Sequence, residues 1–324
     1  MRSDKNTVKL PKSIVLFLVA AALVLLVAAP QMVGNYWLRI LTSVLMYCVI
    51  AQGLNIIVGF AGYHAFGNAA FFGVGAYALG VAETLGVPFI GAIPIAAALS
   101  ALIAVVLGWP LLRLRGHYFA IATVALTLAL SELVTNLGGV TGGAQGLALP
   151  LNTSQSPEQA YREIYYLMVL LVIIATAIVW WLSSSRLGYA LRALKDSERG
   201  AMALGVDTRR AKVIAWSISA ALTGAAGGIW AHWMTFIEVA GAFDLTISVK
   251  AYIMMLIGGM GTILGPIIGA AFFEVFSTLI WSRFTEVHNL VLGVLVCVVV
   301  LALPHGISKP LNTWIANRQA RSKR

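Results

Sequence analysis

Long apolar runs separated by short polar connections occupy most of this chain. Runs at about Trp37–Val58, Gly91–Leu112, His117–Leu137 and Ile164–Leu182 approach or reach the length of about 20 residues that crosses the hydrocarbon layer of a bilayer. The apolar residues are continuous rather than alternating, so they predict α-helices and not the strands of a membrane barrel. The pattern therefore predicts an all-α polytopic membrane protein.

Further apolar runs bring the predicted total to about ten transmembrane helices. These additional spans are Ile14–Ala29, Asn68–Leu85, Val213–Phe236, two spans after Thr246 that are interrupted at Gly258–Pro266, and Leu290–Leu303. The first of them follows a basic stretch and has two interpretations, a cleaved signal peptide or an uncleaved first span. We favour the uncleaved span, because the run is longer than a usual signal core and more spans follow.

One long polar segment, Arg186–Lys212, interrupts the apolar pattern. Short loops rich in Lys and Arg collect on the cytoplasmic side of membranes, so this basic segment is expected there. Asp196 and Ser197 can cap a helix, Glu198 would lie in its first turn, and Gly205 would end it. Two interpretations of this short helix are open: it rests on anionic lipid headgroups, or it docks a cytoplasmic partner.

Composition and charge agree with a membrane protein. Hydrophobic residues make up 60% of the chain and charged residues 10%, against about 25% charged residues in soluble domains. The net charge of +10 does not indicate a nucleic-acid partner, because the basic residues lie in the two tails and in short loops. The exceptions are Arg39, Arg162, Lys250 and Arg283. This distribution predicts that both termini and the Arg186–Lys212 segment are cytoplasmic.

Two glycine-rich stretches interrupt the apolar runs, one in each half of the chain. The first lies within residues 59–80 and the second at Gly258–Pro266. Gly and Pro allow non-helical backbone at membrane depth where protein or a cavity lines it, and paired interruptions often mark a central pathway. The predicted helix-breaking residues are Gly62, Gly67, Gly258, Gly259, Gly261, Gly265 and Pro266.

Two carboxylates, Glu132 and Glu274, lie inside predicted spans. A carboxylate there costs at least a few kcal/mol unless it faces a cavity or a partner. Glu132 can contact a substrate amine, relay protons or form a gate, or it can be a structural group hydrogen-bonded to Ser131 or Thr135. The same alternatives hold for Glu274, with the structural interpretation favoured.

Three residues of the first glycine-rich stretch, His64, Phe66 and Asn68, are further candidates to line a pathway. No catalytic or metal-binding motif accompanies them. The sequence has no GxxxxGK[ST] motif and no Gly-Lys pair, so it has no P-loop. It also has no HExxH, no GxSxG and no paired metal-ligand spacing. We therefore predict no catalytic residue and no metal site.

Four motifs resemble one known family. They are LGYALRALKDSERGAMALGVDTRRAK in the polar segment, GFAGYHAFGNAAFFGVGAY in the first glycine-rich stretch, LRGHYFAIATVALTLALSELVTN in the fifth span, and IGGMGTILGPIIGA. Together they resemble the permease subunits, in particular the M-type subunit, of branched-chain amino acid ABC importers. Glu132 matches the intramembrane Glu of that family. Ala65, Phe66, Asn68 and His117 depart from its pattern, so the resemblance leaves the solute open.

The resemblance implies a transport subunit whose cytoplasmic segment fits an ATPase. It assigns the coupling role to Arg192, Lys195, Asp196, Glu198, Ala203, Leu204 and Gly205. The implied partners are a second homologous permease, two cytoplasmic ABC ATPases, a periplasmic solute-binding protein and the solute. ATP and Mg²⁺ would be bound by the ATPases, with no cofactor on this chain, in a bacterial inner membrane.

The expected organisation is a cytoplasmic tail at 1–13, a transmembrane permease domain at 14–303 and a basic cytoplasmic tail at 304–324. The permease domain would include the coupling loop 184–212 and an extracytoplasmic loop 138–163. Three alternatives are weighed against this reading. They are a permease of the same family for urea or short amides, a proton-coupled secondary transporter using Glu132 and Glu274, and an intramembrane enzyme built on His64, His117 and Glu132.

Overall fold

The computed structural model describes residues 26–114, 116–150, 156–283 and 293. Most of the predicted first span, all but one residue of the predicted last span and both tails lie outside these ranges. The total of ten spans and the side of the termini therefore stay predictions. Six of the described helices are long and apolar enough to cross a membrane, and they cover Asn35–Phe60, Phe89–Leu111, His117–Asn136, Glu158–Ser184, Thr208–Met234 and Val239–Gly258.

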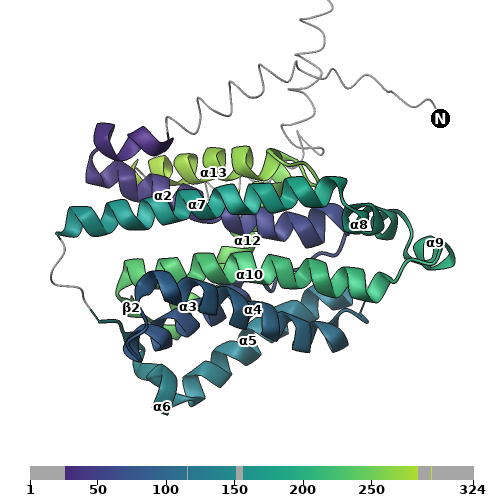
Figure 1. Cartoon of the computed structure of the whole chain (residues 1–324), viewed down its shortest axis with the longest axis horizontal. Helices are drawn as coiled ribbons and strands as arrows, with labels where there is room; N and C mark the ends of the chain where they lie inside the picture. Colours follow the sequence, from purple (N-terminus) through teal and green to yellow (C-terminus); the bar gives the residue numbers. More distant parts are fainter. Residues whose placement is uncertain (1–25, 115, 151–155, 284–292, 294–324) are drawn as a thin grey trace, which may run out of the picture.

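The described helices run side by side and form an elongated bundle (Figure 1). On one side lie α2 (Asn35–Leu54), α7 (Pro157–Ser184) and α13 (Gly265–Arg283). On the other side lie α3 (Asn68–Thr84), α4 (Phe89–Leu111) and α5 (His117–Asn136). The central helix α10 (Thr208–Met234) contacts α3, α4, α2 and α7, while α12 (Leu245–Gly258) packs on α13 and α2. The predicted all-α architecture is confirmed.

Helix α10 can occupy the centre because small residues let neighbouring backbones approach it closely. A side-chain carbon added at Gly75 of α3 would overlap the backbone of Gly224 in α10, and one added at Gly227 would overlap the backbone of Phe72. Such contacts between small residues are a main source of helix association in membranes, where the hydrophobic effect between helices is weak. The glycines of α10 therefore fix how closely α3 packs.

Two helices begin earlier than the apolar pattern predicts. Helix α7 starts at Pro157 instead of Ile164, because Ser156 and Gln159 form a capping box. Helix α10 starts at Thr208 instead of Val213, because the Asp207 side chain accepts a hydrogen bond from the Arg210 amide, 3.1 Å away. As a result, part of the polar segment belongs to the central helix.

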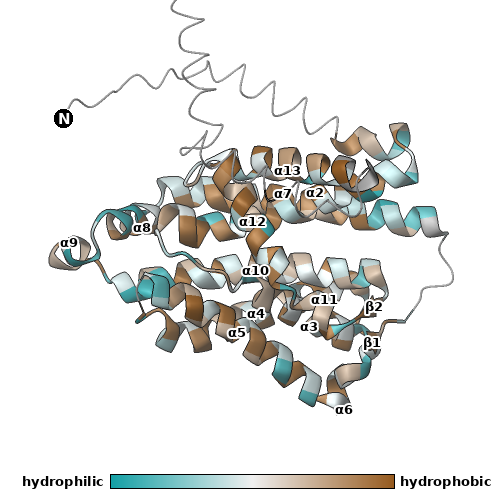
Figure 2. Cartoon of the chain, turned by 180° about the vertical axis from the view of Figure 1, so that it is seen from behind, coloured by the Kyte–Doolittle hydropathy of each residue, from teal (hydrophilic) through white to brown (hydrophobic). Residues whose placement is uncertain are grey.

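The two ends of the bundle differ in character (Figure 2). At one end lie the polar helices α8 (Arg186–Asp196) and α9 (Glu198–Ala203). At the other end the chain forms α6 (Gly138–Thr141), η2 (Gly143–Gln145) and the strand β1 (Leu147–Ala148). This strand pairs antiparallel with β2 (Phe236–Ile237), which precedes α11 (Val239–Ala242). We call the α8–α9 end of the bundle the basic end.

Candidate functional site

The segment between α7 and α10 folds into two short capped helices instead of the single one predicted. Ser185 caps α8 by accepting a hydrogen bond from the Gly188 amide, and Ser197 caps α9 by accepting one from the Gly200 amide. Gly205 follows α9 with a positive φ of 80°, the left-handed conformation that glycine adopts at least cost. The predicted helix after Ser197 and its end at Gly205 are confirmed, whereas α8 is not anticipated by the sequence pattern.

The tip of this segment carries apolar side chains that no part of the described chain covers. Leu204 is 84% exposed and Met202 is 43% exposed, and Ala203 between them is exposed as well. Exposed apolar side chains at the polar end of a helix bundle can form a contact with a partner protein. The local geometry therefore favours a docking helix at α9.

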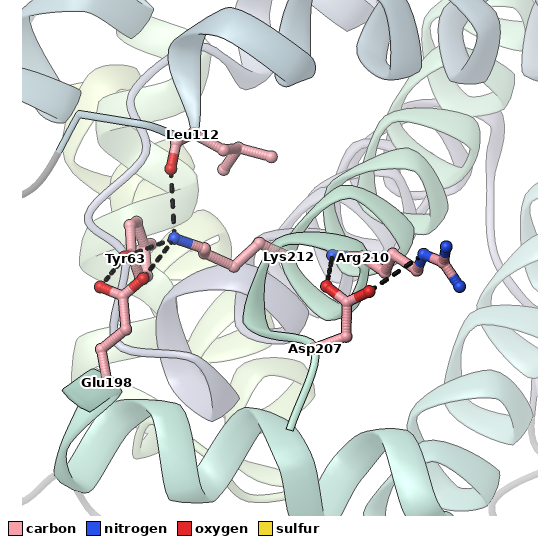
Figure 3. Close-up of polar contacts among 6 residues, drawn as sticks. All are labelled: Tyr63, Leu112, Glu198, Asp207, Arg210 and Lys212. Carbon is pink, nitrogen blue, oxygen red and sulfur yellow. Dashed lines mark hydrogen bonds and ion pairs between the residues drawn. The ribbon is translucent and has the colours of Figure 1, made fainter. Parts of the chain in front are cut away.

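A buried lysine ties α9 to the bundle (Figure 3). The ammonium group of Lys212 in α10 donates to Glu198 Oε1 at 2.7 Å, to the Tyr63 hydroxyl at 3.0 Å and to the Leu112 carbonyl at 3.1 Å. The Tyr63 hydroxyl in turn donates to Glu198 Oε2 at 2.8 Å. All three donor positions of the ammonium group are thus used, which offsets the cost of burying its charge. We call Tyr63, Glu198 and Lys212 the latch.

Helix α8 makes a second link to the bundle through Lys195. Its ammonium group donates to the carbonyl of Gly59 at 2.8 Å, in the π-helix η1 (Asn55–Phe60) that continues α2. Its aliphatic part lies against Gly62, where an added side-chain carbon would contact it. Arg192 lies on the same helix, with its guanidinium over the Phe60 ring. Two coupling residues inferred from the resemblance therefore contact the chain just before the first break.

Side chains of the first break, residues 61–67, contact two different parts of the bundle. Tyr63 joins the latch, whereas His64 and Phe66 contact Tyr252 of α12. The Phe66 and Tyr252 rings stack with centroids 4.9 Å apart, and His64 Nδ1 lies 2.8 Å from the Tyr252 hydroxyl. Desolvation, together with the positive charges of His117 and Lys195, lowers the pKa of His64. A displacement of this short loop would therefore move the latch and the aromatic contact together.

The second break, residues 259–264 between α12 and α13, is held by two buried amides of the first half. Gln52 donates to the Ile263 carbonyl at 2.7 Å. Asn55 donates to the Thr262 carbonyl at 2.8 Å and accepts from the Gly261 amide at 2.8 Å. Backbone groups outside a helix need such partners at membrane depth. The predicted interruption at Gly258–Pro266 is confirmed, since α12 ends at Gly258 and α13 starts at Gly265.

The glycine-rich stretches that contain the two breaks meet at Gly59 and Gly261. An added side-chain carbon at Gly59 would overlap the Gly261 amide, and one at Gly261 would contact the Gly59 carbonyl. The same Gly59 carbonyl accepts the hydrogen bond of Lys195. Helix α8 therefore contacts the junction between the two glycine-rich breaks, which are more than 190 residues apart in the sequence.

The remaining pathway candidates lie in three different environments. Asn68 is buried in the core, where its amide donates to Thr223 of α10 at 3.3 Å. Glu274 is partly buried on α13, and no described residue donates a hydrogen bond to its Oε2 atom. Glu132 is exposed on α5 and accepts a hydrogen bond from Asn136 at 2.9 Å. The structural partners considered for it, Ser131 and Thr135, instead donate to backbone carbonyls.

The exposed face of α5 that carries Glu132 continues into an open pocket of about 610 Å³ at the end opposite α9. The pocket lies between α5, η2 and the start of α12. Its polar lining residues are Ser131, Thr135, Gln145, Glu238 and Asp244. Within the described chain no neighbouring helix covers this face of α5, so an exposed carboxylate there points to a polar path or a partner.

Two latch residues, Tyr63 and Lys212, and the two amides, Gln52 and Asn55, are not identified by the sequence analysis, whereas Glu198 is. Tyr63, Gln52 and Asn55 lie among apolar neighbours in the sequence. An amide side chain near a glycine-rich break can nevertheless indicate a hydrogen-bond partner for non-helical backbone. Lys212 was assigned to a loop because its helix was predicted to begin at Val213. Among the described residues, no three His, Cys, Asp or Glu side chains gather so that they could hold a metal ion.

The sequence was compared with known proteins and solved structures. Residues 36–300 match the sequence profile of the family described as branched-chain amino acid transport system, permease component. The chain is 31% identical to the high-affinity branched-chain amino acid transport system permease protein LivM of Escherichia coli K12, over 94% of this chain and 76% of that protein. It is 25% identical to the corresponding permease LivH of Salmonella typhimurium, over 81% of this chain and 90% of that protein.

A more distant similarity connects the chain to the autoinducer 2 import system permease protein LsrC of Salmonella paratyphi B. The two are 28% identical over 48% of each protein. No solved structure matches.

Proposed function

The chain belongs to the family of permease components of branched-chain amino acid transport systems, and we propose that it forms part of the membrane path for branched-chain or related hydrophobic amino acids. As a member of this family it is a permease subunit of an ABC importer and a multi-pass membrane protein. Its role is transport and not catalysis. The second half of the path would come from a homologous permease, and the uncovered face of α5 with Glu132 is suited to line it.

This proposal is supported mainly by the two contacts that join the α8–α9 segment to the rest of the bundle. Glu198 and Lys195 tie the two short helices to Tyr63 and to Gly59, which border or belong to the first break. The exposed apolar tip at Met202 and Leu204 remains available to a partner. We infer that a cytoplasmic ATPase docks on α9, and that two such ATPases serve the complete importer. They would bind ATP and Mg²⁺, while this chain binds neither.

The latch supplies a route from that docking site to the path. Displacement of α9 moves Glu198, which is bonded to Lys212 and Tyr63, and Tyr63 belongs to the same loop as His64 and Phe66. That loop contacts Tyr252, so the aromatic contact can open or close as α9 moves. Nucleotide-driven motion then shifts the populations of inward- and outward-open states, and the chain itself undergoes no chemical step.

The orientation follows from charge. The basic end, with α8 and α9, would face the cytoplasm of a bacterial inner membrane. The opposite end, with α6, β1 and the pocket between α5 and α12, would then face the periplasm and receive solute from a binding protein. Acidic and hydroxyl side chains around that pocket favour an amine-bearing solute over an anion.

Family membership favours an ABC importer over a proton-coupled transporter. Urea or short amides remain the alternative solutes, and competition tests in uptake assays separate them from amino acids. Labelled leucine uptake that unlabelled isoleucine and valine suppress, and urea does not, would support the proposed solute. Suppression by urea alone would contradict it.

Docking is tested by tagging the chain, solubilising it gently from its native membrane and identifying the copurified proteins. Two ATPases with Walker motifs and a second polytopic subunit are expected. Recovery of the chain alone, or with copies of itself only, would contradict the proposed docking. Asp196→Arg, on the exposed end of α8, should abolish uptake and leave membrane insertion intact.

A matched pair of glycine substitutions tests whether the docking site lies at α9. Gly205 and Gly86 both have a positive φ, at 80° and 87°, and both border open space. Proline cannot adopt that φ, so Gly205→Pro and Gly86→Pro disturb the backbone to a similar extent, but at opposite ends of the bundle. Gly205→Pro should abolish uptake and ATPase copurification, while Gly86→Pro should retain the ATPases. Equal loss in both variants would show that the effect is not local to α9.

A further inference from the structure

A second basic feature of the same end lies beside the latch and shares Glu198 and Lys212 with it. A small open pocket of about 260 Å³ lies between the end of α4 and the start of α10, next to α9. Its lining residues are Leu112, Arg113, Glu198, Thr208, Arg209 and Lys212. The charges of Glu198 and Lys212 neutralise each other within the latch. The charge that remains in the pocket is that of two guanidinium groups.

Neither guanidinium is neutralised by a carboxylate in the described part of the chain. Arg113 is exposed and has no ion pair there. Arg209 lies flat on Trp109, with its guanidinium carbon 3.3 Å from the ring centroid, and donates to the Trp109 carbonyl at 3.3 Å. Among the described residues, none accepts a hydrogen bond from the buried Nε–H group of Arg209. A buried donor without a partner costs free energy.

The pocket lies at the start of α10, where Asp207 caps the helix and pairs with Arg210. The helix has 27 residues and begins at Thr208, whose buried side chain lines the pocket beside Arg209. Helix N-termini and paired guanidinium groups are the usual elements of phosphate recognition. The pocket is thus suited to an anion with several acceptor oxygens and a charge of −1 or −2.

The apolar surface beside the pocket indicates where that anion comes from. One face of α4 is exposed along its length, with the stripe Ile95, Leu99, Leu102, Val106 and Trp109. These residues recur every three or four positions, so they form a continuous surface on one side of the helix. The stripe ends at Trp109, under the guanidinium of Arg209. A molecule with a phosphate head and long apolar chains would cover both features at once.

We propose that the pocket between α4 and α10 binds the phosphate of an anionic phospholipid, whose acyl chains lie along the exposed stripe of α4. Basic pockets between membrane helices at a cytoplasmic surface bind such headgroups. Because two positive charges remain unpaired, a headgroup of net negative charge is preferred over a zwitterionic one. The site is separate from the solute path and from the docking tip of α9.

The test is native mass spectrometry of the purified, delipidated chain or of its complex. The protein is titrated with phosphatidylglycerol and, separately, with phosphatidylcholine of the same acyl chains. The wild type should bind phosphatidylglycerol more tightly by roughly tenfold to thirtyfold, as expected for two cations near a membrane surface. Equal binding of the two lipids would overturn the proposal.

Substitutions test whether Arg113 and Arg209 form the phosphatidylglycerol site. Arg113→Gln combined with Arg209→Gln should remove the preference for phosphatidylglycerol. The control, Arg186→Gln combined with Arg210→Gln, removes the same charge from exposed positions outside the pocket and should keep the preference. Arg209→Lys retains the charge and should keep part of it. If the pocket variant binds like the control, or the control loses the preference equally, the site lies elsewhere.

Inorganic phosphate separates a lipid site from a site for a free anion. Millimolar phosphate lacks acyl chains and should not displace bound phosphatidylglycerol. Complete displacement would mean that the pocket recognises a free anion, which overturns the lipid assignment. Circular dichroism and size-exclusion profiles that match the wild type would show that the variants are folded.

Discussion

The ammonium group of Lys212 lies 2.7 Å from a carboxylate oxygen of Glu198, and the two side chains are only 5% and 15% exposed. Lys212 belongs to the central helix α10, whereas Glu198 is the first residue of the short helix α9. This ion pair therefore joins the part of the chain proposed to contact an ATPase to the core of the bundle. Because Tyr63 bonds to both residues, the first glycine-rich break moves with them.

Replacing Lys212 should uncouple the importer and destabilise the chain. Lys212→Met removes the ammonium group that pairs with Glu198, and breaking a buried pair costs about 3–5 kcal/mol. We expect a lower melting temperature and a loss of solute uptake in cells or proteoliposomes. Removing both charges, with Lys212→Met and Glu198→Gln together, should restore much of the stability but not the uptake.

The comparison between stability and uptake separates a coupling role from a purely structural one. If the double variant recovered uptake along with stability, the latch would be a packing element without a role in coupling. Arg210→Met is the matched control, because the Arg210 side chain is 82% exposed and its ion pair in the described part of the chain is with the neighbouring Asp207. It should leave both measurements near the wild-type values.

Asn55 should be essential for the shape of the second break. Asn55→Leu keeps the approximate size of the side chain but removes both hydrogen bonds to residues 261 and 262, at about 1–3 kcal/mol for each group left without a partner. A lower melting temperature and reduced uptake are expected. Asn35→Leu, at the exposed start of the same helix, serves as the control and should change neither measurement by much.

Replacing Glu132 tests whether its face of α5 lines a polar path or faces lipid. If its carboxylate faces the path, Glu132→Gln should lower uptake severalfold at unchanged solute affinity of the binding protein. If it faced lipid, the neutral side chain would cost less at membrane depth, so the variant would be at least as stable and equally active. Glu158→Gln, at the exposed start of α7, removes the same charge and should leave uptake unchanged.

His64 should make the stability of the chain depend on pH in the acidic range. Its pKa in the folded protein is lowered, so near the ordinary His value of about 6.5 the folded state binds fewer protons than the unfolded state. The free energy of unfolding therefore falls as the pH drops through that value. Melting curves between pH 7.5 and 5.5 should show a smaller decrease for His64→Gln than for the wild type. Identical slopes would contradict the assignment.

Several features of the fold could be predicted from local sequence. The apolar runs predict α2, α4 and α5 to within a few residues, because a membrane helix satisfies its own backbone. Ser197 and Gly205 predict the limits of α9, since caps depend on the residue itself. The four motifs predict the family, which the comparisons confirm. The coupling and path residues stay predictions, because their roles depend on partners.

Other features depend on contacts between distant segments. The sequence predicts that Lys212 lies in a basic loop, whereas in the structure it is buried against Tyr63 and Glu198. Asn55 looked like an isolated polar residue in an apolar run, yet it holds the second break 206 residues away. Asn68 belongs to the glycine-rich stretch that is expected to line a path, yet it packs in the core against α10.

The sequence by itself determined that the chain is an all-α polytopic membrane protein, which segment is basic, and which family the chain belongs to. Each of these depends on hydropathy, capping or motifs that are read within one segment. Only the tertiary structure decided which polar groups pair across segments: Lys195 with Gly59, Lys212 with Glu198, and Asn55 with Gly261. Hydrogen bonds and ion pairs act over a few ångströms, so their partners depend on how the helices pack and not on distance along the chain.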